Sequence, residues 1–414
     1  MKPHSVAMVA ACPFPANWGT PGAIREMSAA LAALGHQVHI VTYPLGEDLS
    51  VGGARVWRPR YWHRSSRLHS GPSYEKPLLD LLLLVKLCRV IRRERISIIH
   101  AHNYEGALIG ILAKFITRRP LVYHAVSLMS DELPSYDFIK PAFLARGVAR
   151  LLDWLVPKFP NQFIAVTPAL KAALIKRGVP EQRIAFIPCG VRAARFNEGD
   201  PRWVRERYEL GDRPVVMYTG INSRFQRIDY LLRSFDLVLK AEPGTVLMVV
   251  SPLENDPDLA RNRALAVSLG VGDSIIWVEG QTLAELPDYL SAALVAVIPR
   301  PDVPGHPIKL LNYMAASRPI VCFAGAAKGV RHMREALVAP DHDWRQFASE
   351  IVTLLHNPEL AKRLGTEARR MVLAQFDWHD LCQDIEAVYS AMVDVRPVFQ
   401  WSRTKRQART SFSP

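Results

Sequence analysis

Short apolar runs alternate with amphipathic stretches along most of this chain. Val6–Ala11 and Val38–Thr42 are too short for helices and rich in Val and Ile, so we expect two buried strands. Between them, Ile24, Met27 and Leu31 recur at three- and four-residue spacing and mark one face of a helix. Repetition of this β-α-β unit predicts a doubly wound parallel sheet.

The same alternation resumes in the second half of the chain. Val215–Tyr218, Val246–Val250 and Ile275–Val278 are predicted strands, and amphipathic stretches separate them. The polar residues 197–212 between the two series have the composition of a linker. A second doubly wound parallel sheet is therefore expected, and the predicted fold class is α/β.

The domain boundaries follow from these two series and from length. A chain of 414 residues is longer than one hydrophobic core usually absorbs, and 49% apolar with 22% charged residues is typical of a globular protein. We predict a first domain over residues 1–198 and a second over 199–377. A terminal helix is expected at 378–395, and the basic, aperiodic residues 396–414 are expected to be disordered.

The net charge limits the class of binding partner, and the cysteines indicate the cellular compartment. A formal net charge of +13 calls for an acidic partner: nucleic acid, anionic lipid or a phosphorylated small molecule. Nucleic acid rests on charge alone, because no nucleic-acid-binding module is recognisable. The five scattered cysteines argue against a disulfide framework or a zinc site and fit a reducing cytoplasm. No apolar run reaches about 18 residues, so no membrane span is predicted, and Val6–Ala11 is better explained as a strand than as a signal peptide.

A strand, a loop and a helix form the first candidate site. Leu294–Pro299 is a predicted strand, a loop broken by Pro and Gly follows, and Ile308, Leu311 and Met314 mark the buried face of a helix. This order places a helix N-terminus, with its free N–H groups and positive dipole end, beside the carboxyl end of a parallel sheet. Open α/β folds bind phosphorylated ligands there.

Gly19 and Gly22 hold a similar position before the first predicted helix. A Gly-x-x-Gly pair is a weak motif that also suits a tight turn. Its place before a helix N-terminus is what makes contact with a ligand plausible.

Titratable side chains follow the predicted strand that ends at Tyr123. His124 and Asp131 lie just beyond it, and chemistry in such folds gathers at the carboxyl ends of strands. We therefore treat both as candidate catalytic residues, with a hydrogen-bonded structural role as the alternative for His124. For His100 and His102, which end another predicted strand, the structural role is favoured.

Two segments mix apolar and basic residues. Residues 138–160 interleave aromatic with basic side chains. This segment has two interpretations: it docks on an anionic membrane surface, or it is an internal amphipathic helix that packs on the sheet. Leu78–Ile91 is leucine-rich and mostly core, although its breadth leaves room for a membrane-facing side. Residues 52–76 are predicted to form a loop, which either covers an anionic ligand or is solvated.

Several motifs, taken in order, resemble one enzyme family. Tyr218-Thr219-Gly220 precedes a helix, and Pro307-x-Lys309-Leu310-Leu311-Asn312-Tyr313-Met314-Ala315-Ala316 precedes Pro319-Ile320-Val321. Ile99-His100-Ala101-His102 ends a strand, and Phe376-x-Trp378 opens the terminal helix. This set resembles the retaining, GT-B-fold glycosyltransferases of family 4, over about Val6 to Val393.

The resemblance implies a fold and a reaction. Its members have two Rossmann-like domains facing a central cleft, and their terminal helix crosses back onto the N-terminal domain. They move a sugar from a nucleotide-diphosphate donor, usually uridine- or guanosine-linked, with retention of the anomeric configuration. The donor lies on the C-terminal domain and the acceptor on the N-terminal one. No metal or other cofactor is expected, because helix N-termini, backbone N–H groups and Lys or Arg stabilise the leaving diphosphate.

The donor-side motif departs from the family pattern. Two glutamates of the family, one meeting the sugar and one the ribose, correspond to Pro304 and Asn312, and an Arg and a Lys that grip the diphosphate correspond to Ile221 and Gln226. Asn312 can still hydrogen-bond a ribose, although without charge. Arg224, Arg227 or Lys309 could supply the lost charge. The donor-binding candidates carried over are Gly19, Gly22, Gly220, Arg224, Gln226, Lys309, Leu310 and Asn312.

The acceptor-side motif also departs from the pattern. In the favoured register the catalytic-region histidine of the family corresponds to Val126, which leaves His124 as the available imidazole. Asp131-Glu132-Leu133-Pro134 does match a group of family members.

Two functional hypotheses follow. The leading one is a glycosyltransferase of the cytoplasm, peripheral on the inner face of the membrane, that acts on a lipid-linked or envelope glycan acceptor in polysaccharide or glycolipid biosynthesis. The alternative is a GT-B-shaped protein that binds a nucleotide or glycan without turnover, as the partner of an active transferase. An anionic membrane surface is a candidate partner of the first, and no nucleic acid is expected.

Overall fold

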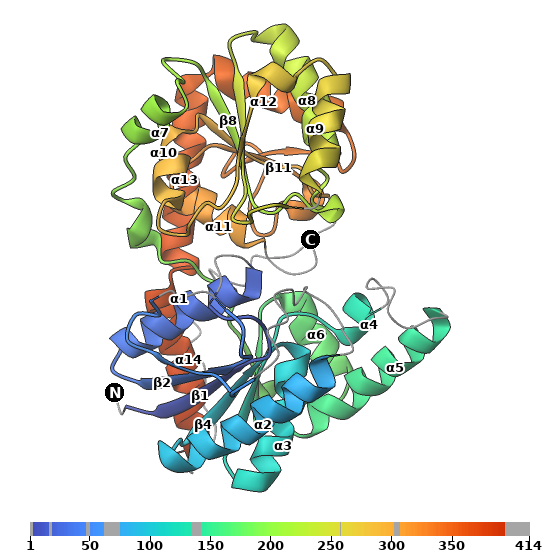
Figure 1. The fold of residues 1–414 in the computed structure, drawn as a ribbon, viewed down its shortest axis with the longest axis vertical. Helices are drawn as coiled ribbons and strands as arrows, with labels where there is room; N and C mark the ends of the chain where they lie inside the picture. The colour runs from blue at the N-terminus through green and yellow to red at the C-terminus, as the bar shows by residue number, and fades with distance from the viewer. Residues whose placement is uncertain are drawn as a thin grey trace. The chain divides into compact units, whose positions relative to one another are not determined.

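The computed structural model describes residues 3–15, 19–46, 50–61, 75–133, 142–256, 258–301 and 307–393. The chain forms two compact units, and Figure 1 shows that each is a sheet flanked by helices. Unit 1 comprises Met1–Cys189 and Trp378–Pro414, and unit 2 comprises Gly190–Asp377. None of the described helices has the length and apolarity that crossing a bilayer requires.

Unit 1 is built on a seven-stranded parallel sheet in the order β3-β2-β1-β4-β5-β6-β7. The order reverses between β1 and β4, which is the topological switch point where such sheets bind ligands. The strands are β1 (Ser5–Ala10), β2 (Gln37–Thr42), β3 (Arg55–Trp57), β4 (Ile98–His102), β5 (Leu121–Ala125), β6 (Gln162–Ala165) and β7 (Ile184–Phe186). The helices are α1 (Gly19–Ala33), α2 (Lys76–Arg93), α3 (Asn103–Thr117), α4 (Met129–Glu132), α5 (Ala142–Leu155), α6 (Pro168–Lys176) and α14 (Trp378–Val393).

Unit 2 is built on a six-stranded parallel sheet in the order β10-β9-β8-β11-β12-β13, and its switch point lies between β8 and β11. The strands are β8 (Val215–Thr219), β9 (Val246–Val250), β10 (Ile275–Val278), β11 (Val295–Ile298), β12 (Ile320–Phe323) and β13 (Leu337–Ala339). The helices are α7 (Arg202–Arg207), α8 (Ile228–Ala241), α9 (Leu259–Ser268), α10 (Leu286–Ala292), α11 (Ile308–Ala315), α12 (Trp344–His356) and α13 (Pro358–Gln375). The prediction of two doubly wound parallel sheets is confirmed.

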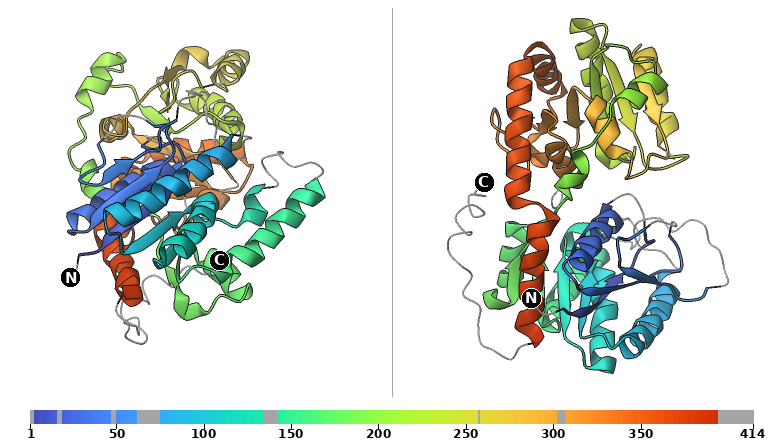
Figure 2. Two further views of the ribbon diagram at one scale, coloured as in Figure 1. Left: turned by 60° about the horizontal axis from the view of Figure 1, so that its bottom comes forward. Right: turned by 90° about the vertical axis from the view of Figure 1, so that its left-hand side faces the viewer.

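Hydrophobic burial explains why the apolar runs became strands. Every residue of β8 and β9 is buried, because helices cover both faces of a parallel sheet. The helices α8 and α12 pack together over one face of the unit 2 sheet, where Phe235 of α8 and Phe347 of α12 belong to the same core. The right-hand view of Figure 2 shows helices and sheet as layers within each unit.

The last helix, α14, belongs to unit 1 although it follows unit 2 in the chain. Its side chains Trp378, Leu381 and Ile385 are buried in one core with Ile24 and Met27 of α1. The expected return of a terminal helix to the first domain is therefore seen in the contacts between α1 and α14.

The structure places the boundary between the units after Cys189 rather than after residue 198. The intervening segment packs on unit 2, because the N–H of Val191 bonds to the carbonyl of Phe376 (2.9 Å) and the N–H of Ala193 bonds to Asp377 Oδ2 (3.2 Å). The predicted linker also contains α7, a short helix that buries Val204.

Several local predictions need correction. The Gly19–Gly22 loop is the first turn of α1, so the loop ends earlier than expected. Strand β5 extends through His124, which therefore lies in the sheet and not beyond it. Residues 52–76 contain the edge strand β3, and β13 was not predicted. The predicted disordered tail 396–414 and Pro304 lie outside the described residues.

Candidate functional site

The switch point of unit 2 holds a lysine at a helix N-terminus. Lys309 is the second residue of α11, and its side chain reaches across to the segment that follows β8. Lys309 Nζ donates hydrogen bonds to Tyr218 Oη (2.9 Å) and to Gln226 Oε1 (3.0 Å), and it lies 4.0 Å from the centre of the Tyr218 ring. An ammonium group and a helix N-terminus thus occur together at the carboxyl end of the sheet, which favours a phosphate ligand.

Gly220 makes room for this lysine. Its φ is +132°, a conformation that L side chains rarely adopt. A Cβ at this position would lie 2.8 Å from Lys309 Nζ and 3.2 Å from Tyr218 Oη. The positive φ therefore favours glycine after β8, and a side chain here would also push the end of the Lys309 side chain out of its place.

Hydrogen bonds hold the end of β8 against α11. Tyr313 Oη accepts hydrogen bonds from the N–H (2.8 Å) and the hydroxyl (3.1 Å) of Thr219, and Tyr218 Oη donates to the carbonyl of Ile221 (2.8 Å). These groups are buried, so each lost bond would leave a desolvated polar atom. The network fixes the position of Lys309 relative to the loop.

Lys309 is buried and lies near a second cation, Arg300. Burial, with a further contribution from Arg300, lowers the pKa of Lys309 well below its usual range. Arg300 follows β11 and lies 4.7 Å from the ring centre of Phe225. No carboxylate lies within 4.0 Å of Lys309 in the part of the chain that the structure describes. A bound polyanion would supply the missing counter-charge.

The other cations proposed for this site are already paired. Arg227 makes a bidentate ion pair with Asp229 (3.0 and 2.9 Å) and lies over the Tyr230 ring. Arg224 is exposed, and its Nε is 3.9 Å from Asp258 Oδ1. Of the three candidates, Lys309 is the one that contacts Gln226.

Two further donor-side predictions differ in their outcome. Asn312 lies three residues after Lys309, so the two side chains leave the same side of α11, and Asn312 is 8% exposed. The Leu310 side chain is fully buried in the core, and its N–H bonds to the carbonyl of Pro307. Asn312 therefore shares the Lys309 side of α11 and its contact with a ribose stays a prediction, whereas the Leu310 side chain packs into the core.

The two titratable candidates of unit 1, His124 and Asp131, lie on β5 and α4. His100, His102 and His124 form one buried group, because the parallel register sets His102 opposite His124. A hydrogen bond joins His100 Nε2 to His124 Nδ1 (3.1 Å), and another joins His100 Nδ1 to the hydroxyl of Tyr389 on α14 (2.6 Å). The structural role predicted for His100 agrees with these two bonds, and His124 takes part in the first of them.

Asp131 lies apart from this group. It is exposed on α4, and no hydrogen bond joins it to His124. Helix α4 is held by the buried Asp153, whose two carboxylate oxygens accept from the N–H groups of Met129 (2.9 Å) and Ser130 (3.1 Å). Asp153 was not singled out from the sequence. It could have been found as the single acidic residue of segment 142–155, whose other residues are apolar or basic.

Gly19 and Gly22 open α1 directly after the loop from β1, at the switch point of the unit 1 sheet. Gly19 has a φ of +52°, which favours glycine at this position. Val126, the position that the resemblance assigns to the family's histidine, is half-buried just beyond β5.

The three histidines are also the group that could hold a metal ion among the described residues. Their ligand nitrogens lie within 4.8 Å of one another. His102 Nε2 has no hydrogen-bond partner, whereas His100 and His124 bond to each other. Because His100 and His124 are already hydrogen-bonded, we assign the three histidines a structural role, which is to connect β4, β5 and α14.

This histidine group predicts acid sensitivity. Burial lowers the pKa of His124 to about 4 and lowers those of His100 and His102 well below the ordinary value of 6.5. The unfolded chain therefore binds protons near pH 6.5, while the native chain does not. We expect the free energy of unfolding to fall as the pH drops from about 6.5 toward about 4, by about 1.4 kcal/mol per pH unit for each histidine.

Urea unfolding followed by circular dichroism at several pH values measures this slope. His124→Gln removes one of the titrating groups, so its slope should be smaller by about one histidine's share. An unchanged slope in the variant would show that His124 is not a buried neutral imidazole.

Family models and known proteins match this architecture. Residues 21–195 match the model described as Glycosyltransferase Family 4, and residues 213–357 match Glycosyl transferases group 1. The D-inositol 3-phosphate glycosyltransferase of Thermobispora bispora is 26% identical over 392 residues, covering 90% of this chain and 89% of the relative.

Two further matches bear on the ligand class and the fold. A GDP-mannose-dependent alpha-(1-6)-phosphatidylinositol monomannoside mannosyltransferase of Mycobacterium tuberculosis is 29% identical over 213 residues, covering 49% of this chain and 54% of the relative. Among solved structures, the sucrose-phosphate synthase of Thermosynechococcus elongatus superposes with a TM-score of 0.77 at 20% identity, covering 93% of this chain and 98% of that one.

Proposed function

Because this chain is a GT-B-fold glycosyltransferase of family 4, an enzyme that transfers sugars from nucleotide sugars, we propose that its acceptor is a lipid-linked or envelope glycan and that transfer retains the anomeric configuration. The family assignment leaves no need for the alternative of a non-catalytic partner. The phosphatidylinositol-linked acceptor in the name of the mycobacterial relative supports a lipid-linked acceptor.

Lys309 is the observation that carries the donor side of the proposal. The leaving nucleoside diphosphate gains negative charge as the glycosidic bond to phosphate breaks. The Lys309 ammonium group, beside the N-terminus of α11 and close to Arg300, is placed to stabilise that charge. Gln226 occupies the position of the lysine found in the family, and Lys309 Nζ lies 3.0 Å from its Oε1. We infer that Lys309 brings the missing charge to the same place from a different element.

A donor and acceptor panel tests the proposed reaction. The full chain is incubated with radiolabelled uridine- and guanosine-diphosphate sugars and with bacterial membrane lipids, and we expect label in the lipid fraction for at least one donor. Proton NMR of that product should show the anomeric configuration of the donor. Absence of both transfer and donor hydrolysis across the panel would refute the proposal, and an inverted product would refute retention.

Asn312 gives a second test of the donor site. If its amide bonds the ribose hydroxyls, Asn312→Ala should raise the Kd for the nucleoside diphosphate by about tenfold, which is the value of one hydrogen bond to a ligand. A 2′,3′-dideoxy nucleotide lacks the hydroxyls, so its Kd should be the same for both proteins. Calorimetric titration measures all four values. An equal loss for both nucleotides would show that Asn312 does not contact the ribose.

A further inference from the structure

Three neighbouring helices of unit 1 expose apolar side chains to solvent. Residues spaced three or four apart form a stripe on each of them, and most are about half exposed or more. We call these stripes the docking face, and they consist of Leu78, Leu81 and Val85 on α2, Leu108, Leu112, Phe115 and Ile116 on α3, and Phe143, Leu144, Val148, Leu151, Trp154 and Leu155 on α5. Apolar exposure on this scale marks an interaction surface.

The three stripes belong to one side of the unit. Helices α2 and α3 pack against each other, and Phe115 of α3 meets Phe159, just after α5, with ring centres 5.7 Å apart. Figure 1 shows α2 beside α3, with one end of α5 close to α3. Of the two interpretations of residues 138–160, packing explains one face of α5, where Ala145 and Ala149 are buried, but it does not explain the face on which Leu151 and Trp154 are 57% and 56% exposed.

The charged side chains that these three helices expose to solvent are positive. Each acidic side chain of these helices has a partner within the protein: Asp80 accepts a hydrogen bond from the Tyr43 hydroxyl, Glu105 pairs with Lys76, and Asp153 is buried against α4. The exposed charged groups are basic, and they are Arg89, Arg92, Arg93, Arg146 and Arg150. A partner of this face must therefore offer apolar contact together with negative charge.

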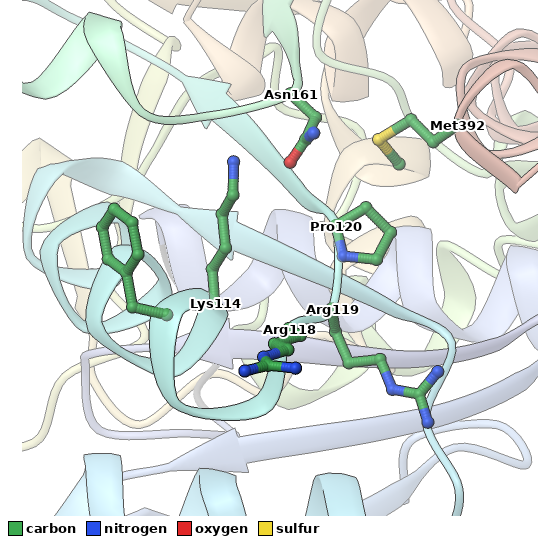
Figure 3. Close-up of a pocket in the computed structure, with 7 residues that line it drawn as sticks. Lys114, Arg118, Arg119, Pro120, Asn161 and Met392 are labelled. Atoms are coloured by element: carbon green, nitrogen blue, oxygen red, sulfur yellow. The ribbon is translucent and has the colours of Figure 1, made fainter.

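A pocket at the C-terminal end of α3 adds a polar feature to this face. Its volume is about 470 Å³, and Lys114, Arg118, Arg119 and Asn161 line it; we call it the basic pocket. Figure 3 shows these side chains around the opening, with Met392 of α14 on the far side. Among the residues described, neither Arg118 nor Arg119 has a salt-bridge partner. Guanidinium groups in this setting suit a phosphate oxygen ligand.

We propose that the docking face rests on an anionic lipid bilayer and that the basic pocket binds a headgroup phosphate there. Aliphatic and aromatic stripes bordered by arginine are the chemistry of an interfacial helix surface, and Trp154 with Lys158 over its ring suits the boundary layer. A second copy of this chain would set the same basic residues against one another. Nucleic acid would leave the aliphatic stripes exposed. This inference does not depend on which sugar is transferred.

Vesicle co-sedimentation of the full chain tests the proposal without any donor. We expect binding to vesicles of phosphatidylcholine mixed with phosphatidylglycerol, little binding to phosphatidylcholine alone, and weakening by salt. The double variant Arg118→Glu/Arg119→Glu should weaken binding at least tenfold, since each basic group near an anionic surface contributes about a fivefold factor and two groups are lost. Phe115→Ser/Trp154→Ser should weaken it comparably, by removing the inserted apolar groups.

A matched control lies on unit 2. Val267 is 73% exposed on α9 and Arg233 is exposed on α8, so Val267→Ser/Arg233→Glu makes the same kinds of change away from the docking face and should leave vesicle binding unaltered. Nucleoside diphosphate binding should be normal in every variant, which separates this test from that of the transfer reaction. Equal binding to both vesicle types, no binding to either, or undiminished binding by the Arg118/Arg119 variant would overturn the proposal.

Discussion

Replacing Lys309 with glutamine is expected to lower kcat/KM for the nucleotide sugar by about two to three orders of magnitude. That is the effect of removing one charged or hydrogen-bonding group that stabilises charge only in the transition state. The Lys309 side chain holds Nζ 2.9 Å from Tyr218 Oη and 3.0 Å from Gln226 Oε1, so this nitrogen is positioned before the substrate arrives, and the bound diphosphate favours its charged form. Initial rates of donor consumption measure the loss.

A second substitution separates charge from packing. Because Gln226 Oε1 and Lys309 Nζ are in contact, a lysine at 226 can place its ammonium group where that of Lys309 was. The double variant Lys309→Gln/Gln226→Lys should therefore recover at least tenfold of the lost activity, with an unchanged melting temperature. Failure of rescue in a folded double variant would mean that Lys309 acts through the local structure of the loop and not through its charge.

Gly365→Ala is expected to destabilise unit 2 by about 2 to 3 kcal/mol, the range for overpacking a close contact. Helices α11 and α13 pack together, and a Cβ on Gly365 would lie 2.2 Å from the carbonyl oxygen of Ser317 and 3.0 Å from its carbon. These are backbone atoms at the end of α11, so they cannot rotate away. The helix that carries Lys309 must shift, and activity should fall with stability.

Thermal unfolding compared with a matched glycine checks this prediction. Gly147 also lies inside a helix, α5, and a Cβ there would meet nothing within 4 Å. Gly147→Ala should be stabilising by about 0.5 to 1 kcal/mol, because alanine loses less backbone entropy in a helix. If Gly365→Ala were equally harmless, the close packing of α13 on α11 would be wrong.

Local patterns predicted most elements because each carries its own signal. Ile320–Phe323 is a run of four apolar residues after a proline, and it forms β12 with those bounds. The edge strand β3 was missed because three residues, Arg55–Trp57, give too short an alternation. Helix α3 was not predicted because apolar side chains surround it: Ile109 is buried while Leu112 is exposed on the docking face.

The site needed information that no local pattern holds. Lys309 and Gln226 are 83 residues apart, and their contact depends on how β8 and α11 meet at the switch point. His124 was placed beyond its strand, whereas the parallel register sets it beside His102 inside the sheet. Residue types therefore supplied candidates, and the register of the sheets decided which of them meet.

A crystal structure with a bound nucleotide tests the role of Lys309 in the donor site most directly. In a crystal structure of the enzyme with a nucleoside diphosphate, we predict that Lys309 Nζ lies about 2.7 to 2.9 Å from a phosphate oxygen, the length of a charge-assisted hydrogen bond. Arg300 should face the same diphosphate. A diphosphate bound elsewhere, with Lys309 still bonded to Tyr218 and Gln226, would contradict the central claim that this lysine replaces the charge missing at position 226.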